Sequence, residues 1–349
     1  MIELDILLPF GLPPAELSAD LLRELHAPAL ATLLARAKLA QQEQRDGFQL
    51  ALPHETWLAQ QFGFAGNDGS SPPVAEALMQ KAGLQTDNAG AWFILQPVHI
   101  HIARDHLVLT DPRQLGLDEN EARALFKVAE PLLAEAGKAL RFGEPGIWFV
   151  QAGDWAGLRT ATPDAACGHN IDIWMPAGPQ ERNWRKVQNE VQMHWFNHPV
   201  NEQREARGEK PVNSVWLWGG PSGTGTRPGA RYDKIFNLSG WMQAFCAAAP
   251  RHGEAGDGAQ LLPQMAGRNL LLLDALLEPA LSSDWAGWLD GMRKLEERWF
   301  APLLQSLQSA KLDTISLILT HDARISRFAA SRPSLRKFWV KPSLARLCP

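Results

Sequence analysis

Polar side chains able to orient a ligand recur along one stretch that is predicted to be helical, residues 182–207. They follow one another at intervals of three or four residues: Glu190, His194, Asn197, Asn201 and Arg204. This spacing places them on one stripe of a helix, between apolar flanks. His, Asn and Arg side chains can line a pocket, whereas a solvated ridge usually carries Lys and Glu pairs. Both interpretations stay open, and Pro199 is expected to kink the helix before the last two polar groups.

Two histidine pairs have a spacing that metal ligands also show. His194 and His198 are four residues apart, and Glu190 precedes His194 by the same interval. A metal site would need a third ligand and supporting contacts. His198 directly precedes a proline, so it is equally suited to cap a second helical segment. His99 and His101 share one face of a predicted strand, where a solvated hairpin face is the favoured interpretation.

A glycine-rich loop, residues 220–225, follows the apolar strand Val215–Trp218 and copies the spacing of a nucleotide-binding P-loop. The next two positions, which a P-loop fills with Lys and Ser or Thr, hold Thr226 and Arg227. ATP or GTP hydrolysis is therefore disfavoured. A flexible loop at a strand end is still a common ligand-binding position in α/β proteins, so Gly219 and Gly220 are candidate ligand contacts.

A second strand-end motif is Leu319-Thr320-His321-Asp322. Strand ends are where α/β enzymes place acids, bases and metal ligands, so His321 and Asp322 are candidates for these roles. Ordinary solvation of a strand end explains them equally well. The sequence has no Gly-x-Ser-x-Gly motif, and Cys167 lacks the basic neighbours of an activated thiol.

The helices and strands expected from the sequence, which must position the candidate side chains, indicate an α/β protein with a mostly parallel sheet flanked by helices. Residues 1–152 are expected to form an N-terminal α+β portion with a first strand, helices over 15–44 and 119–139, and a hairpin over 92–110. Residues 153–349 are expected to form the α/β portion. There, predicted strands at 212–218, 234–237, 270–273 and 314–319 alternate with helices at 182–207, 239–248 and 284–310.

Charge and cysteine content limit the function classes. The 34 Lys and Arg residues are balanced by 38 Asp and Glu residues, which makes nucleic acid a poor partner and favours a small molecule or a protein. Three widely spaced cysteines indicate a reducing compartment. The acidic start lacks signal-peptide features, and no apolar stretch is long enough to cross a bilayer, so we expect a cytoplasmic protein that is not membrane-bound. The 14 Trp residues are expected mainly in the core.

Several motifs resemble the RpfE-type regulatory protein family of bacteria. They are Cys167–Pro176, Gln188–His198, Pro211–Gly220, Leu8–Pro14 and Phe338-Trp339. Members of that family are often labelled as similar to cofactor-independent phosphoglycerate mutases of the alkaline-phosphatase type. The resemblance implies a three-layer αβα fold, and the mutases would carry two divalent metals on Asp and His residues at strand ends. Here Leu4-Asp5-Ile6-Leu7-Leu8 stands in place of their Asp-Gly-x-x-Asp motif, and Thr320-His321-Asp322 matches their late Asp-His pair only loosely.

The first functional hypothesis is a ligand-binding or regulatory protein on a phosphatase-like scaffold, with no cofactor firmly implied. Its pocket for a small anionic metabolite would combine stretches near residues 170, 194 and 213, and Arg204 would receive the anion. The candidate pocket residues are His169, Asn170, Glu190, His194, Asn201, Arg204, Asn213, Gly219 and Gly220. The alternative is a metal-dependent phosphoryl transferase in which His321, Asp322, His194 and Glu190 act as ligands or acid/base groups. Whether the chain is an enzyme, and its oligomeric state, stay open.

Overall fold

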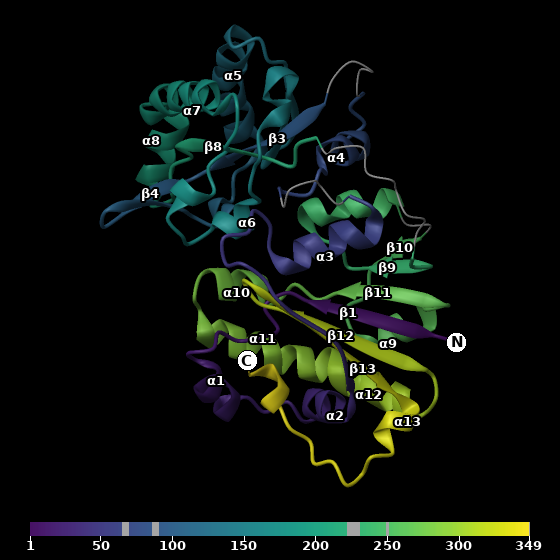
Figure 1. The fold of residues 1–349 in the computed structure, drawn as a ribbon. Helices are drawn as coiled ribbons and strands as arrows, with labels where there is room; N and C mark the ends of the chain where they lie inside the picture. Colours follow the sequence, from purple (N-terminus) through teal and green to yellow (C-terminus); the bar gives the residue numbers. More distant parts are fainter. Residues whose placement is uncertain (65–69, 86–90, 222–230, 249–250, 349) are drawn as a thin grey trace. The chain divides into compact units, whose positions relative to one another are not determined.

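The chain consists of two compact units, as seen in a computed structural model that describes every residue except 65–69, 86–90, 222–230, 249–250 and 349 (Figure 1). Unit 1 combines residues 1–47 with 228–349, and unit 2 is the intervening stretch 48–227. The boundary expected between residues 152 and 153 lies inside unit 2. Strands from both sides of that position, β3 (Trp92–Val98) and β8 (Ser214–Trp218), pair in one sheet, so the two sides form a single body.

Within its described residues, unit 1 is built on a seven-stranded sheet in the order β10-β9-β11-β1-β12-β13-β2. Its parallel strands are β10 (His252–Gly253), β9 (Lys234–Phe236), β11 (Arg268–Leu272), β1 (Glu3–Leu8) and β12 (Thr314–Thr320). The antiparallel strands β13 (Arg324–Ser331) and β2 (Lys38–Gln44) complete one edge. The nearly continuous apolar runs of β1 and β12 are buried, as expected of central parallel strands. The predicted mostly parallel sheet of an α/β protein is confirmed.

Helices of unit 1 cover this sheet, and Figure 1 shows α1, α2, α11 and α12 along one face. The helices are α1 (Ser18–Glu24), α2 (Pro28–Arg36), α9 (Gly258–Leu261), α10 (Leu277–Leu281), α11 (Trp285–Leu295), α12 (Ala301–Gln308) and α13 (Arg332–Leu335). The described residues of unit 1 also form one π-helical turn, η6 (Glu296–Phe300), between α11 and α12, and three 3₁₀ segments, η4 (Gly240–Ala248), η5 (Leu262–Gln264) and η7 (Ala345–Leu347). The first helical prediction extended too far, because residues 38–44 form β2. Their polar run offers no apolar stripe to bury, and it pairs as an exposed edge strand instead.

Within its described residues, unit 2 contains a four-stranded antiparallel sheet in the order β6-β7-β3-β8, with β6 at Leu140–Glu144 and β7 at Ile147–Gln151. The hairpin predicted over residues 92–110 is shorter than expected: β4 (Ile100–Ala103) and β5 (His106–Leu109) form it, whereas residues 92–98 form β3 of the four-stranded sheet. Its helices are α3 (Pro53–Phe62), α4 (Ala75–Lys81), α5 (Glu119–Glu135), α6 (Pro163–Ala166), α7 (Glu181–Phe196) and α8 (Pro199–Ala206). Three 3₁₀ segments are η1 (Pro112–Leu115), η2 (Gly153–Gly157) and η3 (Ile171–Ile173). The prediction that β8 joins the parallel sheet was wrong, because β8 pairs antiparallel with β3.

Tryptophan forms much of the core of unit 2. Trp148 packs edge-on against Trp195 at 5.9 Å between ring centroids, and Trp155 packs in the same way on Trp184 at 5.5 Å. All four rings are buried. The prediction that Trp serves mainly in the core is therefore confirmed. Among the described residues, no helix combines the length and apolar character that crossing a membrane requires.

Candidate functional site

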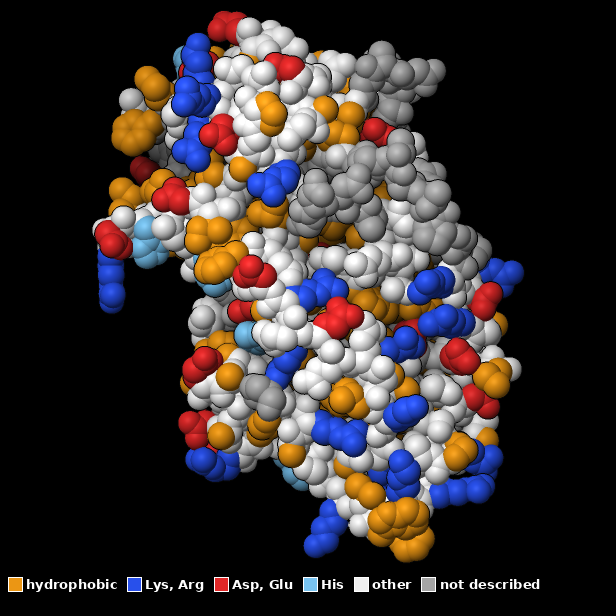
Figure 2. Space-filling model, in the orientation of Figure 1, with side chains coloured by type: hydrophobic (Ala, Val, Ile, Leu, Met, Phe, Trp, Pro, Cys, Tyr) orange, Lys and Arg blue, Asp and Glu red, His pale blue; other side chains and the backbone are white. Residues whose placement is uncertain are grey.

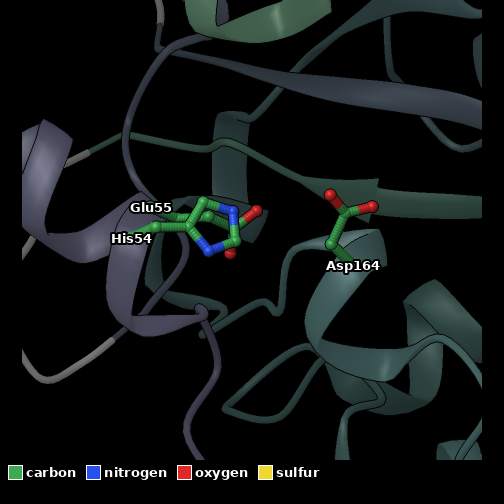
Figure 3. Close-up of side chains that lie close together, drawn as sticks. All are labelled: His54, Glu55 and Asp164. Atoms are coloured by element: carbon green, nitrogen blue, oxygen red, sulfur yellow. The ribbon is translucent and has the colours of Figure 1, made fainter. Parts of the chain in front are cut away.

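Unit 2 contains a buried cluster of His54, Glu55 and Asp164 (Figure 3). The first two lie in the opening turn of α3 and the third in α6, and a proline occupies the first position of both helices. One possible ligand atom from each side chain lies within 4.8 Å of the others. His54 and Glu55 are fully buried and Asp164 is 5% exposed. Three ionisable side chains have therefore been removed from water together.

Glu55 is held through one carboxylate oxygen. Its Oε2 accepts a hydrogen bond of 2.6 Å from the Thr162 hydroxyl and one of 2.7 Å from the backbone N–H of Leu52. The other oxygen, Oε1, is buried without a hydrogen-bond partner among the described residues. Burial first, and then the nearby Asp164 carboxylate, raise the pKa of Glu55 to about 8. At neutral pH and without a bound cation, Glu55 therefore holds a proton.

Arg113 fixes the second carboxylate of the cluster. Its two terminal nitrogens donate to the two oxygens of Asp164 at 3.0 and 2.9 Å, and its Nε donates to Asp111 at 3.1 Å. Burial raises the pKa of Asp111 and lowers the pKa of His54 to about 4, so that His54 is a neutral imidazole at neutral pH. The cluster thus combines an imidazole with carboxyl groups in a dry interior, which suits either proton retention or metal coordination.

A second candidate lies in unit 1, at the carboxyl edge of its parallel sheet. A cavity of about 540 Å³ opens where β9, β10 and β11 end. Asn237, at φ +59°, follows β9, and its side-chain amide exchanges two 2.9 Å hydrogen bonds with the backbone of Ala255. The Ser239 hydroxyl donates to Asp274 at 2.5 Å. The cavity is lined by Asn237, Leu238, Ser239, Gly240, Gln243, Glu254, Ala255, Gly256, Gln260 and Asp274.

Sequence reasoning missed these lining residues, although a signal for them existed. Asp274 stands two residues after β11, and Ser239 stands three residues after β9. The rule that drew attention to His321 and Asp322, namely polar groups just after an apolar strand, applies to both. His54 and Glu55 gave no comparable signal, because an acidic residue in the first turn of a helix is common.

The other part of the same edge does not fit a two-metal centre. After β1 the chain continues with Pro9 and Phe10, and the Phe10 ring packs edge-on against His321 at 5.9 Å. His321 Nδ1 lies 3.9 Å from the Asp322 carboxylate. Within the described part of the chain, the one close set of three or more His, Cys, Asp and Glu ligands is the His54 cluster of unit 2. His321 and Asp322 are therefore a pair without a third clustered ligand among the described residues.

The structure gives Arg204 and Asn201 internal partners rather than a place in a pocket. Arg204 is 1% exposed; it donates to the backbone carbonyl of Lys210 at 2.9 Å, to Glu121 at 2.6 Å and to the carbonyl of Leu115. The amide of Asn201 bonds the backbone of Trp195 and Val212 at 2.8 to 2.9 Å. Arg204 was expected to contact an anion, but in the structure its guanidinium joins α8 to η1 and α5.

The remaining polar groups of the α7 stripe lie at its surface. His194 is exposed, and Glu190 lies 3.8 Å from Lys186 in an i,i+4 ion pair. Glu190 also borders a small cavity of about 260 Å³ between α5 and α7. The helix stops at Phe196, and His198 Nδ1 accepts from the Val200 N–H as the cap of α8. The kink predicted at Pro199 is observed as a break between α7 and α8, and the part of the stripe that lies before it has the geometry of a solvated ridge.

His169 and Asn170 are occupied by short-range contacts. The His169 ring stacks on Trp174 at 5.1 Å between centroids. The Asn170 side chain accepts from the Asp172 N–H at 3.2 Å, which caps η3. Neither contact brings these side chains to the α7 stripe.

Asn213 and the glycines after β8 also have packing roles. The Asn213 amide exchanges two 2.8 Å hydrogen bonds with the backbone of Ile100. A Cβ atom on Gly220 would lie 1.8 Å from the Phe93 ring, and Gly219 has φ +68°. Only glycine fits both positions without rearrangement. The rest of the predicted loop, from residue 222 onward, lies outside the described residues.

Comparison with known proteins relates the chain to phosphoglycerate mutases. No family model matches. The chain is 26% identical over 176 residues to a probable 2,3-bisphosphoglycerate-independent phosphoglycerate mutase of Geobacter sulfurreducens, covering 49% of this chain and 42% of the relative. It is 28% identical over 123 residues, 34% of this chain and 30% of the relative, to the 2,3-bisphosphoglycerate-independent phosphoglycerate mutase of Methanosarcina mazei. The chain thus spans less than half the length of these curated relatives.

Among solved structures, the PH0037 protein from Pyrococcus horikoshii shares the fold. The TM-score is 0.50 at 12% identity, over 95% of this chain and 87% of the other. Over part of its length the chain is thus distantly related in sequence to cofactor-independent phosphoglycerate mutases, and it shares the α/β fold of the PH0037 protein.

Proposed function

We propose that the chain binds a small metabolite at the carboxyl edge of the unit 1 sheet and does not catalyse phosphoryl transfer there. The observation that carries this proposal is the cavity of about 540 Å³ at the ends of β9, β10 and β11. Open α/β sheets bind their ligands at this edge. The position after β1, by contrast, holds Pro9 and Phe10. A binding role also accords with the resemblance to RpfE-type regulatory proteins.

The lining favours an amine-bearing ligand over the small anionic metabolite anticipated from the sequence. Its charged members among the described residues are Glu254 and Asp274, both acidic. Two carboxylates repel a phosphate group and attract a cation. Ser239, already hydrogen-bonded to Asp274, and the nearby amides supply further polar contacts. On the face shown in Figure 2, acidic and basic side chains are interspersed.

A ligand screen by thermal shift tests the pocket. Amine-bearing metabolites are expected to raise the melting temperature of the wild-type chain, and phosphorylated metabolites are not. Asp274→Asn should remove the effect, because it removes the charge of the half-buried member of the acidic lining. Asp20→Asn is the matched control, since Asp20 is a surface residue of the same unit and is 73% exposed. Stabilisation by phosphorylated compounds that is equal in the wild type and Asp274→Asn would overturn the proposal.

Metal-dependent phosphoryl transfer is the second candidate, and the distant homology to the mutases favours it. His321 and Asp322, at the end of β12, are the residues of this chain that would take part. The discriminating measurement is mutase and phosphatase turnover after addition of Mn²⁺ or Mg²⁺. Turnover that Asp322→Asn abolishes would establish this candidate and refute the non-catalytic proposal. No turnover above that of a metal blank supports the binding role.

A further inference from the structure

We infer that His54, Glu55 and Asp164 of unit 2 bind one divalent metal ion of the zinc and manganese class. They offer one imidazole nitrogen and two carboxylate oxygens, with one atom from each inside a 4.8 Å span (Figure 3). Zinc and manganese accept this mixture of ligands at bond lengths of about 2.0–2.2 Å. A small inward movement of the side chains would bring all three atoms around one ion. This site is separate from the sheet-edge pocket, which is made entirely of unit 1 residues.

Glu55 supplies an independent indication of a missing ligand. The side chain is fully buried, and its Oε1 is without a hydrogen-bond partner among the described residues. A buried carboxylate oxygen without a partner is costly, and native proteins normally satisfy such atoms with a donor, a water or an ion. The second oxygen is fixed by Thr162 and Leu52, so the carboxyl group cannot turn to satisfy both. A metal ion at Oε1 completes its coordination.

The charge of the surrounding network matches a divalent cation. The carboxyl groups of Glu55, Asp164 and Asp111 face a single guanidinium, that of Arg113. With all three ionised, the network carries two negative charges in excess, and a divalent ion neutralises them.

The supporting contacts are those expected around a structural metal. Arg113 orients Asp164 through two parallel hydrogen bonds, and Thr162 both holds Glu55 and caps α6 through the Ala165 N–H. Such outer contacts set the direction of the coordinating atoms. Because the ligands come from α3 and α6, the ion would link two segments more than 100 residues apart in the chain. Its expected role is to stabilise unit 2.

Elemental analysis of the full-length protein, purified without chelator and then loaded with Zn²⁺ or Mn²⁺ and desalted, tests the site. The wild type is expected to retain about one ion per chain. Glu55→Gln keeps the shape of the side chain but removes its charge, and it should lower retention at least about tenfold. Glu130→Gln is the matched control, since Glu130 is an exposed residue of α5 in the same unit. Asp322→Asn tests whether the ion binds at the sheet edge instead. Since Asp322 is not a ligand of the proposed site, this variant should retain the ion as the wild type does.

A titration of the chelator-stripped wild type keeps the test independent of whether Glu55→Gln folds. Stoichiometric Zn²⁺ or Mn²⁺ should raise its melting temperature. A wild type that retains no ion and does not change in melting temperature overturns the inference. Retention that survives in Glu55→Gln but is lost in Asp322→Asn overturns it as well, and would move the metal to the sheet edge. None of these outcomes depends on the amine ligand proposed for unit 1.

Discussion

Replacing Arg204 with Met separates a structural role of this residue from a ligand-binding one. The substitution keeps most of the apolar stem and removes a guanidinium that is 1% exposed and bonds three elements. Breaking a buried charge pair costs about 3–5 kcal/mol. Glu121 keeps Arg207 as a second partner, so the cost of breaking the Arg204–Glu121 pair lies at the lower end of this range. The backbone carbonyls of Lys210 and Leu115 lose their donor, at about 1 kcal/mol each. We expect the free energy of unfolding to fall by about 5 kcal/mol.

Urea denaturation followed by circular dichroism measures this loss, and hydrogen exchange locates it. Peptides covering residues 112–121 and 199–218 should lose protection, because Arg204 joins η1, α5 and the segment before β8. His194→Ala is the control from the same helical region, and as an exposed substitution it should change stability by less than about 0.5 kcal/mol. If Arg204→Met is as stable as the control and exchange is unchanged, the structural account of Arg204 is refuted.

Three further predictions concern other buried groups. In chelator-treated protein, raising the pH from 6.5 to 8 should lower the free energy of unfolding by about 2 kcal/mol, because the folded pKa of Glu55 is about 8 while its ordinary value is 4.5. The stabilisation from protonated Glu55 is complete below pH 4.5 and is lost as pH rises through 8. His54, with a folded pKa of about 4, makes the free energy of unfolding rise with pH below 6.5. A Glu55→Gln variant whose free energy of unfolding falls as steeply as that of the wild type above pH 6.5 would contradict the assignment. Asp5→Ala should lower the free energy of unfolding, measured by urea denaturation, by about 2 kcal/mol, because Arg268 and Arg327 lose the buried carboxylate that they share. A change below about 0.5 kcal/mol would show that these ion pairs do not contribute to stability. Burial raises the pKa of Cys167 to about 12, so its alkylation by iodoacetamide at pH 8, followed by mass spectrometry, should be at least about 100-fold slower in native than in unfolded protein; similar rates would mean that the thiol is accessible.

Much of the fold can be predicted from local periodicity in the sequence. The stripe of residues 182–207 became α7 and α8 with a break at Pro199, and the late apolar runs became strands of the parallel sheet. These features depend on neighbours within one or two turns, which a sequence displays directly. Strand partners depend on residues far away. The pairing of β8 with β3 rather than with the parallel strands left no local mark, and neither did the edge strand β2, whose polar sequence resembles a helix surface.

The candidate sites were harder to predict for the same reason. A polar stripe on a helix has the same sequence pattern whether it faces a ligand, solvent or the backbone of the next segment. In the structure His194 faces solvent, whereas Asn201 and Arg204 face the backbone. The His54 cluster joins residues separated by more than 100 positions, and its chemistry comes from burial, which composition does not reveal. Asp274, two residues after β11, also meets the strand-end rule, although it was not among the predicted site residues.

The division of the chain has a consequence for its synthesis on the ribosome. Unit 2 is one continuous stretch, so all of its contacts can form once residue 227 has left the exit tunnel. Strand β1 is made well before its neighbours β11 and β12, which begin at residues 268 and 314, so it must wait until those strands emerge. Throughout that interval an apolar strand with unpaired backbone groups is open to association with other chains. Nascent unit 1, rather than unit 2, is therefore where we expect molecular chaperones to engage this protein.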